Sequence, residues 1–253
     1  MEVPLTPYRV VARNIDPEAD NAIHGDEVAQ QFGFVGALVP GVELFAYATS
    51  PLVAAWGLGW LSGGRLDLRF RCPVYDGEEL LVTLVDGVLE VTGPDGEVRC
   101  TGSAGLGEQQ VRLHDPVPLP SELARTPTVG PFGSLSEAGT IAYNDAYLEA
   151  IAEPLELYRE QALAHPGLLL RLVNLLLMRN VALGPWVHTA SRCHLLAPAR
   201  LPAQIAVHGT VTEVYEKKGN GYVEYDALVL ADDVPVMAVE HTAIYRLGSE
   251  TVG

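Results

Sequence analysis

An internal repeat constrains this 253-residue chain more than any other feature. Each copy begins with Pro-Gly and runs through mostly apolar residues to a tryptophan 20 positions after the proline. The copies extend from Pro40 to Trp60 and from Pro166 to Trp186. Proline suits the first turn of a helix, because its missing N–H would have no partner there. Each run therefore predicts a long, buried helix.

Strand-like segments follow each predicted helix in the same order. Residues 65–73 and 191–198 both end at a proline, and each is followed by two strand-like runs around a Gly-containing turn. These runs are 79–91 and 97–106 in the first half and 204–216 and 222–231 in the second, where a last strand, 235–247, closes the half. The matched spacing, order and closing prolines favour a duplicated unit over chance similarity between two apolar helices.

The predicted fold class is α+β: two curled antiparallel sheets, each wrapped around a long central helix. One helix against such a sheet, present twice, is the double hotdog architecture. We expect an N-terminal hotdog at 1–114, a Pro- and Gly-rich linker at 115–133 and a C-terminal hotdog at 134–253. Two halves in one chain would imitate the dimer that single hotdogs form, with a ligand tunnel at the junction.

Composition excludes several functions. With 16 Lys+Arg against 32 Asp+Glu, the formal charge is −16, which argues against a nucleic-acid or anionic-membrane binder, although a local basic patch stays open. The apolar stretch 168–186 carries Arg171, Asn174 and Arg179, which are costly inside a membrane, so it predicts a buried helix. The N-terminus lacks the basic start and apolar core of a signal peptide, and we expect a cytoplasmic protein.

The three cysteines, at 72, 100 and 193, have no metal-type spacing. We therefore expect neither a disulfide framework nor a metal site. His188, Arg192 and His194 alternate along one predicted strand, so we expect their side chains to share a face.

The residues before the first helix carry a family resemblance. The segment 21–26, Asn-Ala-Ile-His-Gly-Asp, is followed by Ala29, by Gly33-Phe34 and by Pro40-Gly41. This pattern resembles the signature of MaoC-like (R)-specific enoyl-CoA hydratases and dehydratases, Asp-x-Asn-Pro-x-His-x-Asp, with a later His-Gly at the start of the hotdog helix. The likeness is specific over about residues 15–60 and elsewhere rests on element order and the repeat.

The resemblance implies a set of catalytic residues. His24 matches the histidine that handles the water or proton, Asn21 matches the asparagine, and Gly41 matches the glycine whose N–H polarises the thioester carbonyl. A helix start has unpaired N–H groups, which suit an enolate-like oxygen. Two positions depart from the signature: Ala19 stands where the family has its catalytic aspartate, and Pro40 replaces the histidine before the glycine.

The second half holds a divergent copy of the motif. Glu153 falls at the aspartate position and Tyr158 at the histidine position, and His165 precedes Pro166-Gly167. We expect Glu153 and Tyr158 to contribute to substrate binding along the acyl tunnel, or else to lie on exposed helix ends. Asp26 is expected to be the N-cap of a short helix that ends at Gly33.

Two further groups are candidates for substrate binding. Arg65, Arg69 and Arg71 alternate with apolar residues, so they share one face of a strand, either as a solvated surface or as a site for coenzyme A phosphates. Arg171 and Asn174 are three apart on the second helix, where they would line a polar pocket or reach the surface.

The function expected from the resemblance is that of a MaoC-like lyase, which hydrates an enoyl thioester or dehydrates a 3-hydroxyacyl thioester without a cofactor. The substrate would be carried by coenzyme A or by an acyl carrier protein, and the chain would be a homodimer or a monomeric double hotdog. A thioesterase or polyketide-type tailoring enzyme, and a non-catalytic acyl or small-ligand binder, are the alternatives.

Overall fold

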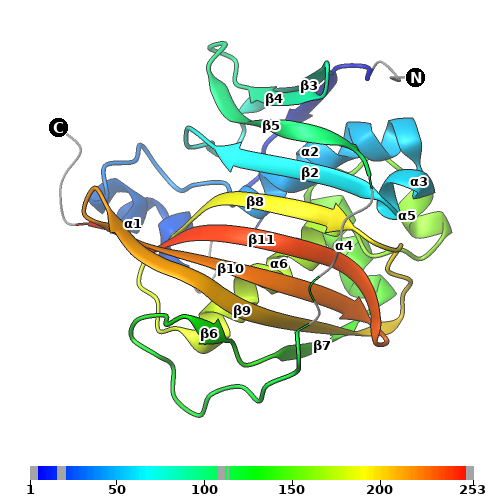
Figure 1. The fold of residues 1–253 in the computed structure, drawn as a ribbon. Helices are drawn as coiled ribbons and strands as arrows, with labels where there is room; N and C mark the ends of the chain where they lie inside the picture. Colours follow the sequence, from blue (N-terminus) through cyan, green and yellow to red (C-terminus); the bar gives the residue numbers. More distant parts are fainter. Residues whose placement is uncertain (1–4, 16–20, 108–111, 113, 249–253) are drawn as a thin grey trace.

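The strands of both halves form one continuous antiparallel sheet (Figure 1). The computed structural model of the protein describes residues 5–15, 21–107, 112 and 114–248. Within them, eleven strands form a sheet in the order β1-β3-β4-β5-β2-β8-β11-β10-β9-β6, and β7 also pairs with β9. The strands are β1 Tyr8–Val11, β2 Gly64–Phe70, β3 Glu79–Val85, β4 Val88–Thr92, β5 Val98–Leu106, β6 Gly130–Pro131, β7 Leu135–Gly139, β8 Val187–Leu195, β9 Ala203–Lys217, β10 Asn220–Ala231 and β11 Val234–Arg246.

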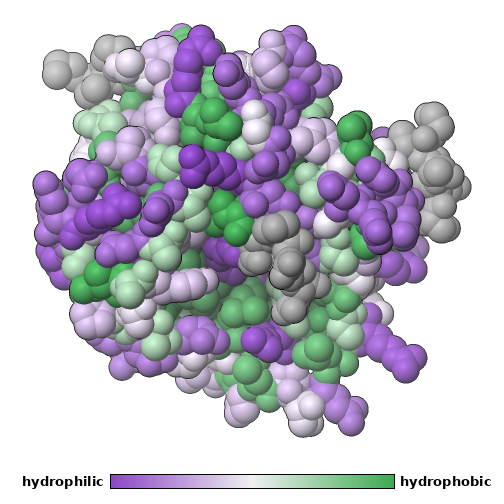
Figure 2. All heavy atoms as spheres, turned by 180° about the vertical axis from the view of Figure 1, so that it is seen from behind, coloured by the Kyte–Doolittle hydropathy of each residue, from purple (hydrophilic) through white to green (hydrophobic). Residues whose placement is uncertain are grey.

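The helices lie behind the sheet in the view of Figure 1. Two long helices, α2 and α6, pack against each other and against the inner face of the sheet. The helical elements are η1 Ala22–His24 (a 3₁₀ turn), α1 Asp26–Gln31, α2 Gly41–Trp56, α3 Leu58–Leu61, α4 Ile141–Ala150, α5 Leu157–Glu160 and α6 Pro166–Asn180. Seen from the helix side, apolar residues gather around a hollow (Figure 2).

The two halves match strand by strand about the β2–β8 pair. Reading outward, β5, β4, β3 and β1 on one side correspond to β11, β10, β9 and β7 on the other. The antiparallel pairing of β2 with β8 joins the halves, for example at Leu68 opposite Ser191. The prediction of a duplicated unit with a curled sheet around each long helix is confirmed, and the two sheets are parts of one.

The prediction of a single strand over 79–91 is wrong. The segment forms two strands, β3 and β4, joined by a tight turn at Asp86 and Gly87. Both turn residues have positive φ, 50° and 78°, as an Asp-Gly hairpin turn requires. The Asp-Gly pair is itself a hairpin signal, and the apolar residues on both sides of it form the two paired strands. With three strands after β2, the first half repeats the second more closely than the sequence indicated.

The two tryptophans of the repeat do not occupy equivalent places. The first apolar run contains two helices, because Gly57 at φ 55° ends α2, and Trp60 lies buried in α3. The second helix ends at Asn180, so Trp186 lies in the segment that leads into β8. The equal spacing from proline to tryptophan therefore reflects two different local structures.

The core lies between the inner face of the sheet and the helices. On β2, Leu66 and Leu68 are buried, whereas Arg65 and Arg69 are exposed on the outer face, as the alternation predicted. Among the described helices, none is both long and apolar enough to cross a membrane.

Candidate functional site

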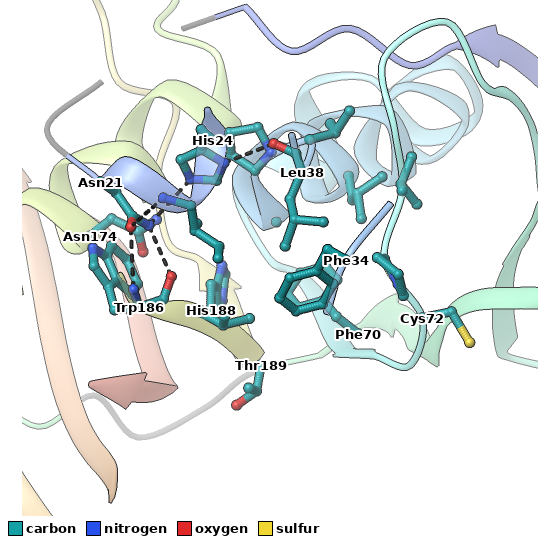
Figure 3. Close-up of a pocket in the computed structure, with 18 of the residues that line it drawn as sticks. Asn21, His24, Phe34, Leu38, Phe70, Cys72, Asn174, Trp186, His188 and Thr189 are labelled. Carbon is teal, nitrogen blue, oxygen red and sulfur yellow. Dashed lines mark hydrogen bonds between the residues drawn. The ribbon is translucent and has the colours of Figure 1, made fainter. Parts of the chain in front are cut away.

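A pocket of about 180 Å³ lies at the start of α2, between the two halves of the chain (Figure 3). The first half contributes η1, the loop before α2 and the end of β2, and the second half contributes α6 and the start of β8. Its lining includes Asn21, Ile23, His24, Phe34, Leu38, Val39, Pro40, Gly41, Leu44, Phe70, Arg71, Cys72, Pro73, Val74, Asn174, Trp186, Val187, His188 and Thr189. The three residues implied as catalytic, Asn21, His24 and Gly41, therefore lie around one pocket.

His24 is held in one tautomer by the backbone. Its Nδ1 lies 2.8 Å from the carbonyl oxygen of Leu38, and a carbonyl only accepts, so Nδ1 carries the proton. Nε2 is then the basic nitrogen of the neutral ring, and it lies 3.3 Å from Nδ2 of Asn21. This arrangement is suited to a group that accepts a proton or a hydrogen bond at Nε2.

Asn21 connects the two halves through its side-chain amide. Nδ2 donates to the carbonyl oxygen of Trp186 at 2.9 Å, and Oδ1 accepts from the backbone N–H of Trp186 at 3.2 Å. The same Oδ1 caps η1 by accepting from the N–H of Ile23. Asn21 is buried, so these bonds are shielded from water. The amide thus fixes the position of His24 relative to the second half.

Three buried polar atoms of the lining lack a hydrogen-bond partner among the described residues. They are Nδ1 of His188, Nε1 of Trp186 and Oδ1 of Asn174. Buried polar groups are nearly always paired with protein or water, so unpaired ones around a pocket indicate that a ligand or ordered water completes them. Asn174 was predicted as a substrate-binding residue, and the structure places it here.

The start of α2 also faces the pocket. The first N–H groups of a helix have no partner within it, and Pro40, the N-cap residue, makes no side-chain capping bond. Gly41 is the first helical residue, and a Cβ at this position would come within 2.9 Å of Nδ1 of His188 and 3.0 Å of the Phe70 ring. The absence of a side chain therefore lets His188 and Phe70, which also line the pocket, pack directly against the helix start.

A second pocket of about 220 Å³ shares one wall with the first. The shared wall consists of Asn21, His24, Pro40, Asn174 and Trp186. Beyond it, the lining is mainly apolar and comes from α6, with Leu168, Leu172, Leu175 and Met178. The two pockets together provide a polar centre flanked by an apolar chamber.

The corresponding place in the second half is closed. His165 is the N-cap of α6, and its Nδ1 accepts from the N–H of Gly167 at 3.0 Å. Its Nε2 lies 3.3 Å from Oε2 of Glu153, which also accepts from Ser50 at 2.6 Å. The Tyr158 ring packs 4.6 Å from the His165 ring. All these side chains are buried, and the helix start that they cap has no open face.

Glu153 and Tyr158 are therefore not brought to the pocket. They line neither chamber and belong to the closed cluster around His165. Burial alone would raise the pKa of Glu153, but its contacts with His165 and the hydrogen bonds from Ser50 and the Leu155 N–H outweigh burial and lower it, which keeps this carboxylate charged. Burial raises the pKa of Tyr158 well above its usual value. Their expected role in binding substrate has no support in this placement.

The predicted basic residues separate into three places. Arg71 lines both the pocket and a groove on the outer face of the sheet, and Arg69 lines only that groove. Arg65 lies farther along the same face, beside His194. Arg171 lines the second chamber, and its Nη1 lies 2.5 Å from Oε1 of the fully buried Glu43. Of the three alternating arginines, Arg71, which directly follows β2, is thus the one that reaches the pocket.

Two local predictions are wrong. Asp26 is the first residue of α1 rather than its N-cap, and its carboxylate accepts from the N–H of Ala37, which ties down the loop before α2. His188 does not share a face with Arg192 and His194, because the β8–β11 register shifts between Thr242 and Ala243. Such an irregularity reverses the alternation, so His188 points inward.

Ala19 lies outside the described residues, as do Asp16, Glu18 and Asp20. The part of the pocket lining that the structure describes contains no carboxylate. A group of three or more His, Cys, Asp or Glu side chains placed to hold a metal ion is also absent from the described chain.

No family model matches the sequence, and no curated protein matches it. Several solved structures are similar to this chain. A MaoC domain protein dehydratase from Chloroflexus aurantiacus superposes with a TM-score of 0.66 at 14% identity, over 97% of this chain and 95% of that one. A Mycobacterium tuberculosis protein described as having a double hotdog fold gives a TM-score of 0.65 at 13% identity, over 96% of both chains.

This chain has a double hotdog fold. The prediction of that architecture is confirmed over nearly the whole length of both neighbours. A thioesterase from Novosphingobium aromaticivorans is also similar, with a TM-score of 0.50 at 16% identity, over 83% of this chain and 89% of that one. Proteins named as a dehydratase and as a thioesterase are thus both similar in structure to this chain, so the similarity by itself does not distinguish between these two activities.

His188, Trp186 and Phe70 are pocket residues that the sequence-based assignment of site residues missed. The sequence identifies His188 only as one of three alternating polar residues, because the strand irregularity that turns it inward cannot be read from the sequence. Trp186 is one of the two tryptophans of the repeat, and that pattern predicts a place at the end of a helix rather than in the wall of a pocket.

Proposed function

We propose that the protein is a thioester-processing enzyme with one active site per chain, and that its reaction is the hydration of an enoyl thioester or the reverse dehydration of a 3-hydroxyacyl thioester. The observation that carries the proposal is the difference between the two long helices. The start of α2 is uncapped and faces a pocket beside His24, whereas the start of α6 is capped by His165 and buried.

The geometry suggests a place for each part of the substrate. The thioester carbonyl would accept a hydrogen bond from the N–H of Gly41, where the helix start favours negative charge as it develops. The β-hydroxyl, or the water that adds in the reverse direction, would lie at Nε2 of His24. The acyl chain would extend into the apolar chamber along α6.

The carrier would approach from the outer face of the sheet. Arg71 lines both the pocket and the outer groove, and Arg69 lies in the same groove. Guanidinium groups bind phosphate oxygens through paired N–H donors. A phosphopantetheine arm, from coenzyme A or an acyl carrier protein, would therefore enter past Arg71. The named dehydratase from Chloroflexus aurantiacus supports this reaction class through its fold.

Thioester hydrolysis is a second candidate. It is favoured by Ala19 at the position of the family's catalytic aspartate and by the thioesterase from Novosphingobium aromaticivorans among the similar structures. The same carbonyl position at Gly41 would serve an acyl transfer to water. The free thiol that hydrolysis releases separates this reaction from hydration.

The test is to incubate the purified protein with crotonyl-CoA and follow two signals. Loss of the enoyl-thioester absorbance without free thiol supports hydration, whereas release of thiol supports hydrolysis. His24→Gln should lower the rate of hydration by about 100-fold or more. His194→Gln is the matched control, because His194 points to the outer face of β8 and should leave the rate unchanged. Binding of crotonyl-CoA without either signal would overturn the proposal in favour of a ligand-binding protein.

A further inference from the structure

His188 is the second imidazole of the pocket, and it comes from the other half of the chain. It lies at the start of β8, is 6% exposed and contacts the edge of the Phe70 ring, with the ring centroids 4.7 Å apart. Its Nδ1 faces the start of α2, as the 2.9 Å approach to a Cβ built on Gly41 shows. Figure 3 shows His24 and His188 among the residues around the same pocket.

The other nitrogen of His188 belongs to a buried chain of hydrogen bonds. Nε2 lies 2.7 Å from Oγ of Ser191, and the same Oγ lies 2.9 Å from Nδ1 of His241. The two imidazoles stack with their centroids 4.1 Å apart, and the His241 ring also contacts Tyr225 at 4.9 Å. All four side chains are buried, so the orientation of His188 is determined by contacts on the side away from the pocket.

The direction of the Ser191 hydrogen bonds determines whether Nδ1 of His188 is a hydrogen-bond donor or an acceptor toward the pocket. A hydroxyl has one proton, so it donates to one imidazole and accepts from the other. When Ser191 donates to His241 and accepts from Nε2–H of His188, Nδ1 of His188 is a bare lone pair. Nδ1 has no hydrogen-bond partner among the described residues, so in this arrangement its lone pair is available to a ligand, whereas in the reverse arrangement Nδ1 carries the proton.

Burial also keeps the ring neutral. It lowers the pKa of His188 to about 3, against a smaller opposing effect of a backbone contact with Ala190. Burial and the neighbouring His188 likewise lower the pKa of His241. At neutral pH both rings are therefore uncharged.

We propose that His188 is a catalytic base of this site, the group that takes the proton from the α-carbon of the thioester, and that Ser191 and His241 are its positioning residues. The inference rests on the proposed function. The α-carbon is bonded to the carbonyl carbon, so a carbonyl oxygen held by the N–H of Gly41 places the α-carbon beside the helix start. Nδ1 of His188 is the basic atom at that place.

The dehydration step balances with one imidazole. The Cα–H bond breaks, its proton moves to Nδ1 of His188, and its electron pair forms an enolate whose oxygen is held by the N–H of Gly41. The enolate pair then forms the C=C bond as the Cβ–O bond breaks. The departing hydroxyl takes the proton from His188 and leaves as water, so the imidazole returns to its neutral state. Hydration follows the same steps in reverse.

The test measures proton abstraction separately from turnover. (R)-3-Hydroxybutyryl-CoA is incubated with the enzyme in D₂O, and both crotonyl-CoA formation and α-deuterium in the remaining substrate are followed by mass spectrometry. His188→Gln keeps a hydrogen-bonding group near Ser191 but has no base, and it should reduce both signals by about 100-fold or more. His24→Gln should lose crotonyl-CoA formation while retaining deuterium exchange. His194→Gln, on the outer face of the same strand, should retain both.

The outcomes separate the two proposals. Exchange by His188→Gln at the wild-type rate would overturn the role of His188 while leaving the proposed function intact. A wild-type enzyme that neither dehydrates nor exchanges would overturn the proposed function, and the role of His188 with it. Should His188→Gln fail to fold by circular dichroism, Ser191→Ala decides: kcat should fall about 10-fold at unchanged KM and be restored by Ser191→Thr. An unchanged kcat in Ser191→Ala would then overturn the inference.

Discussion

His165 caps α6 by accepting a hydrogen bond at Nδ1 from the backbone N–H of Gly167, 3.0 Å away. No described side chain makes the corresponding contact at Pro40, the N-cap of α2. Both helices begin at Pro-Gly. The protein caps the first N–H groups of α6, whereas those of α2 face a pocket. The two described helix starts therefore differ: that of α2 faces a pocket, and that of α6 is buried.

The buried cluster around His165 and Glu153 at the start of α6 should stabilise the fold. His165→Ala removes the cap of α6 and leaves the buried Glu153 carboxylate without its histidine, so we expect a loss of about 3 kcal/mol or more in the free energy of unfolding. Thr140→Ala is the control: it removes an ordinary N-cap, that of α4, and should cost about 1 kcal/mol. Urea denaturation measures both. Equal losses in the two variants would show that the Glu153 contact has no energetic role.

The two helix-start glycines should respond differently to alanine. Gly41→Ala places a methyl group against His188 and Phe70 in the pocket, and kcat/KM should fall by about 100-fold in a folded protein. Gly167→Ala places a methyl group against the Tyr147 hydroxyl in a buried interior, so it should lower the melting temperature and leave kcat of the folded fraction unchanged. Steady-state kinetics beside thermal unfolding separates the effects, and a kcat defect in Gly167→Ala would contradict the assignment of one site per chain.

The ion pair between α2 and α6 should show strong coupling. Glu43 is fully buried and Arg171 is partly so, and removing one side chain takes away an opposite charge that lies 2.5 Å from the other. Glu43→Gln and Arg171→Gln should each cost about 3 kcal/mol, whereas the double variant should cost less than their sum. A double-mutant cycle by denaturant unfolding measures the coupling. Additive losses would mean that the pair does not act as a unit.

Stability should fall as the pH drops below about 6.5, the ordinary pKa of histidine. The pKa values of His188 and His241 are lowered by burial, that of His188 to about 3, so the unfolded chain binds protons in this range that the folded chain does not. The free energy of unfolding then decreases by up to about 1.4 kcal/mol per pH unit for each histidine. Unfolding curves between pH 7 and pH 5 should show a smaller slope for His188→Gln than for the wild type, and identical slopes would contradict a neutral, buried His188.

Arg71 and Arg65 should contribute differently to binding of the carrier. Arg71→Ala should raise KM for crotonyl-CoA about 10-fold at nearly constant kcat, since Arg71 reaches both the pocket and the outer groove. Arg65→Ala, farther along the same face, serves as the matched control and should change KM little. The increase for Arg71→Ala should shrink at high salt, because screening weakens its contact with phosphate in the wild type. Equal KM values for both variants would contradict a role of Arg71 in binding the phosphates of the carrier.

The amino-acid sequence by itself determined the duplicated helix-and-sheet architecture and the residues of the 21–41 motif that surround the pocket. These features follow from local chemistry: Pro-Gly starts a helix, apolar alternation on β2 gives one buried face, and a motif keeps its spacing along the chain. The same locality explains why Asn21, His24 and Gly41 could be placed together, since they lie within one short segment before and at the start of α2.

Only the tertiary structure decided which helix start is open and which residues from the other half face it. The inward position of His188 depends on a register shift against β11, and the closure of the second copy depends on contacts of His165 with residues far from it in sequence. Each is set by pairing and packing between distant segments, which no local pattern encodes. The repeat thus predicted two similar units, and packing between distant segments left a pocket at the helix start of one and buried the helix start of the other.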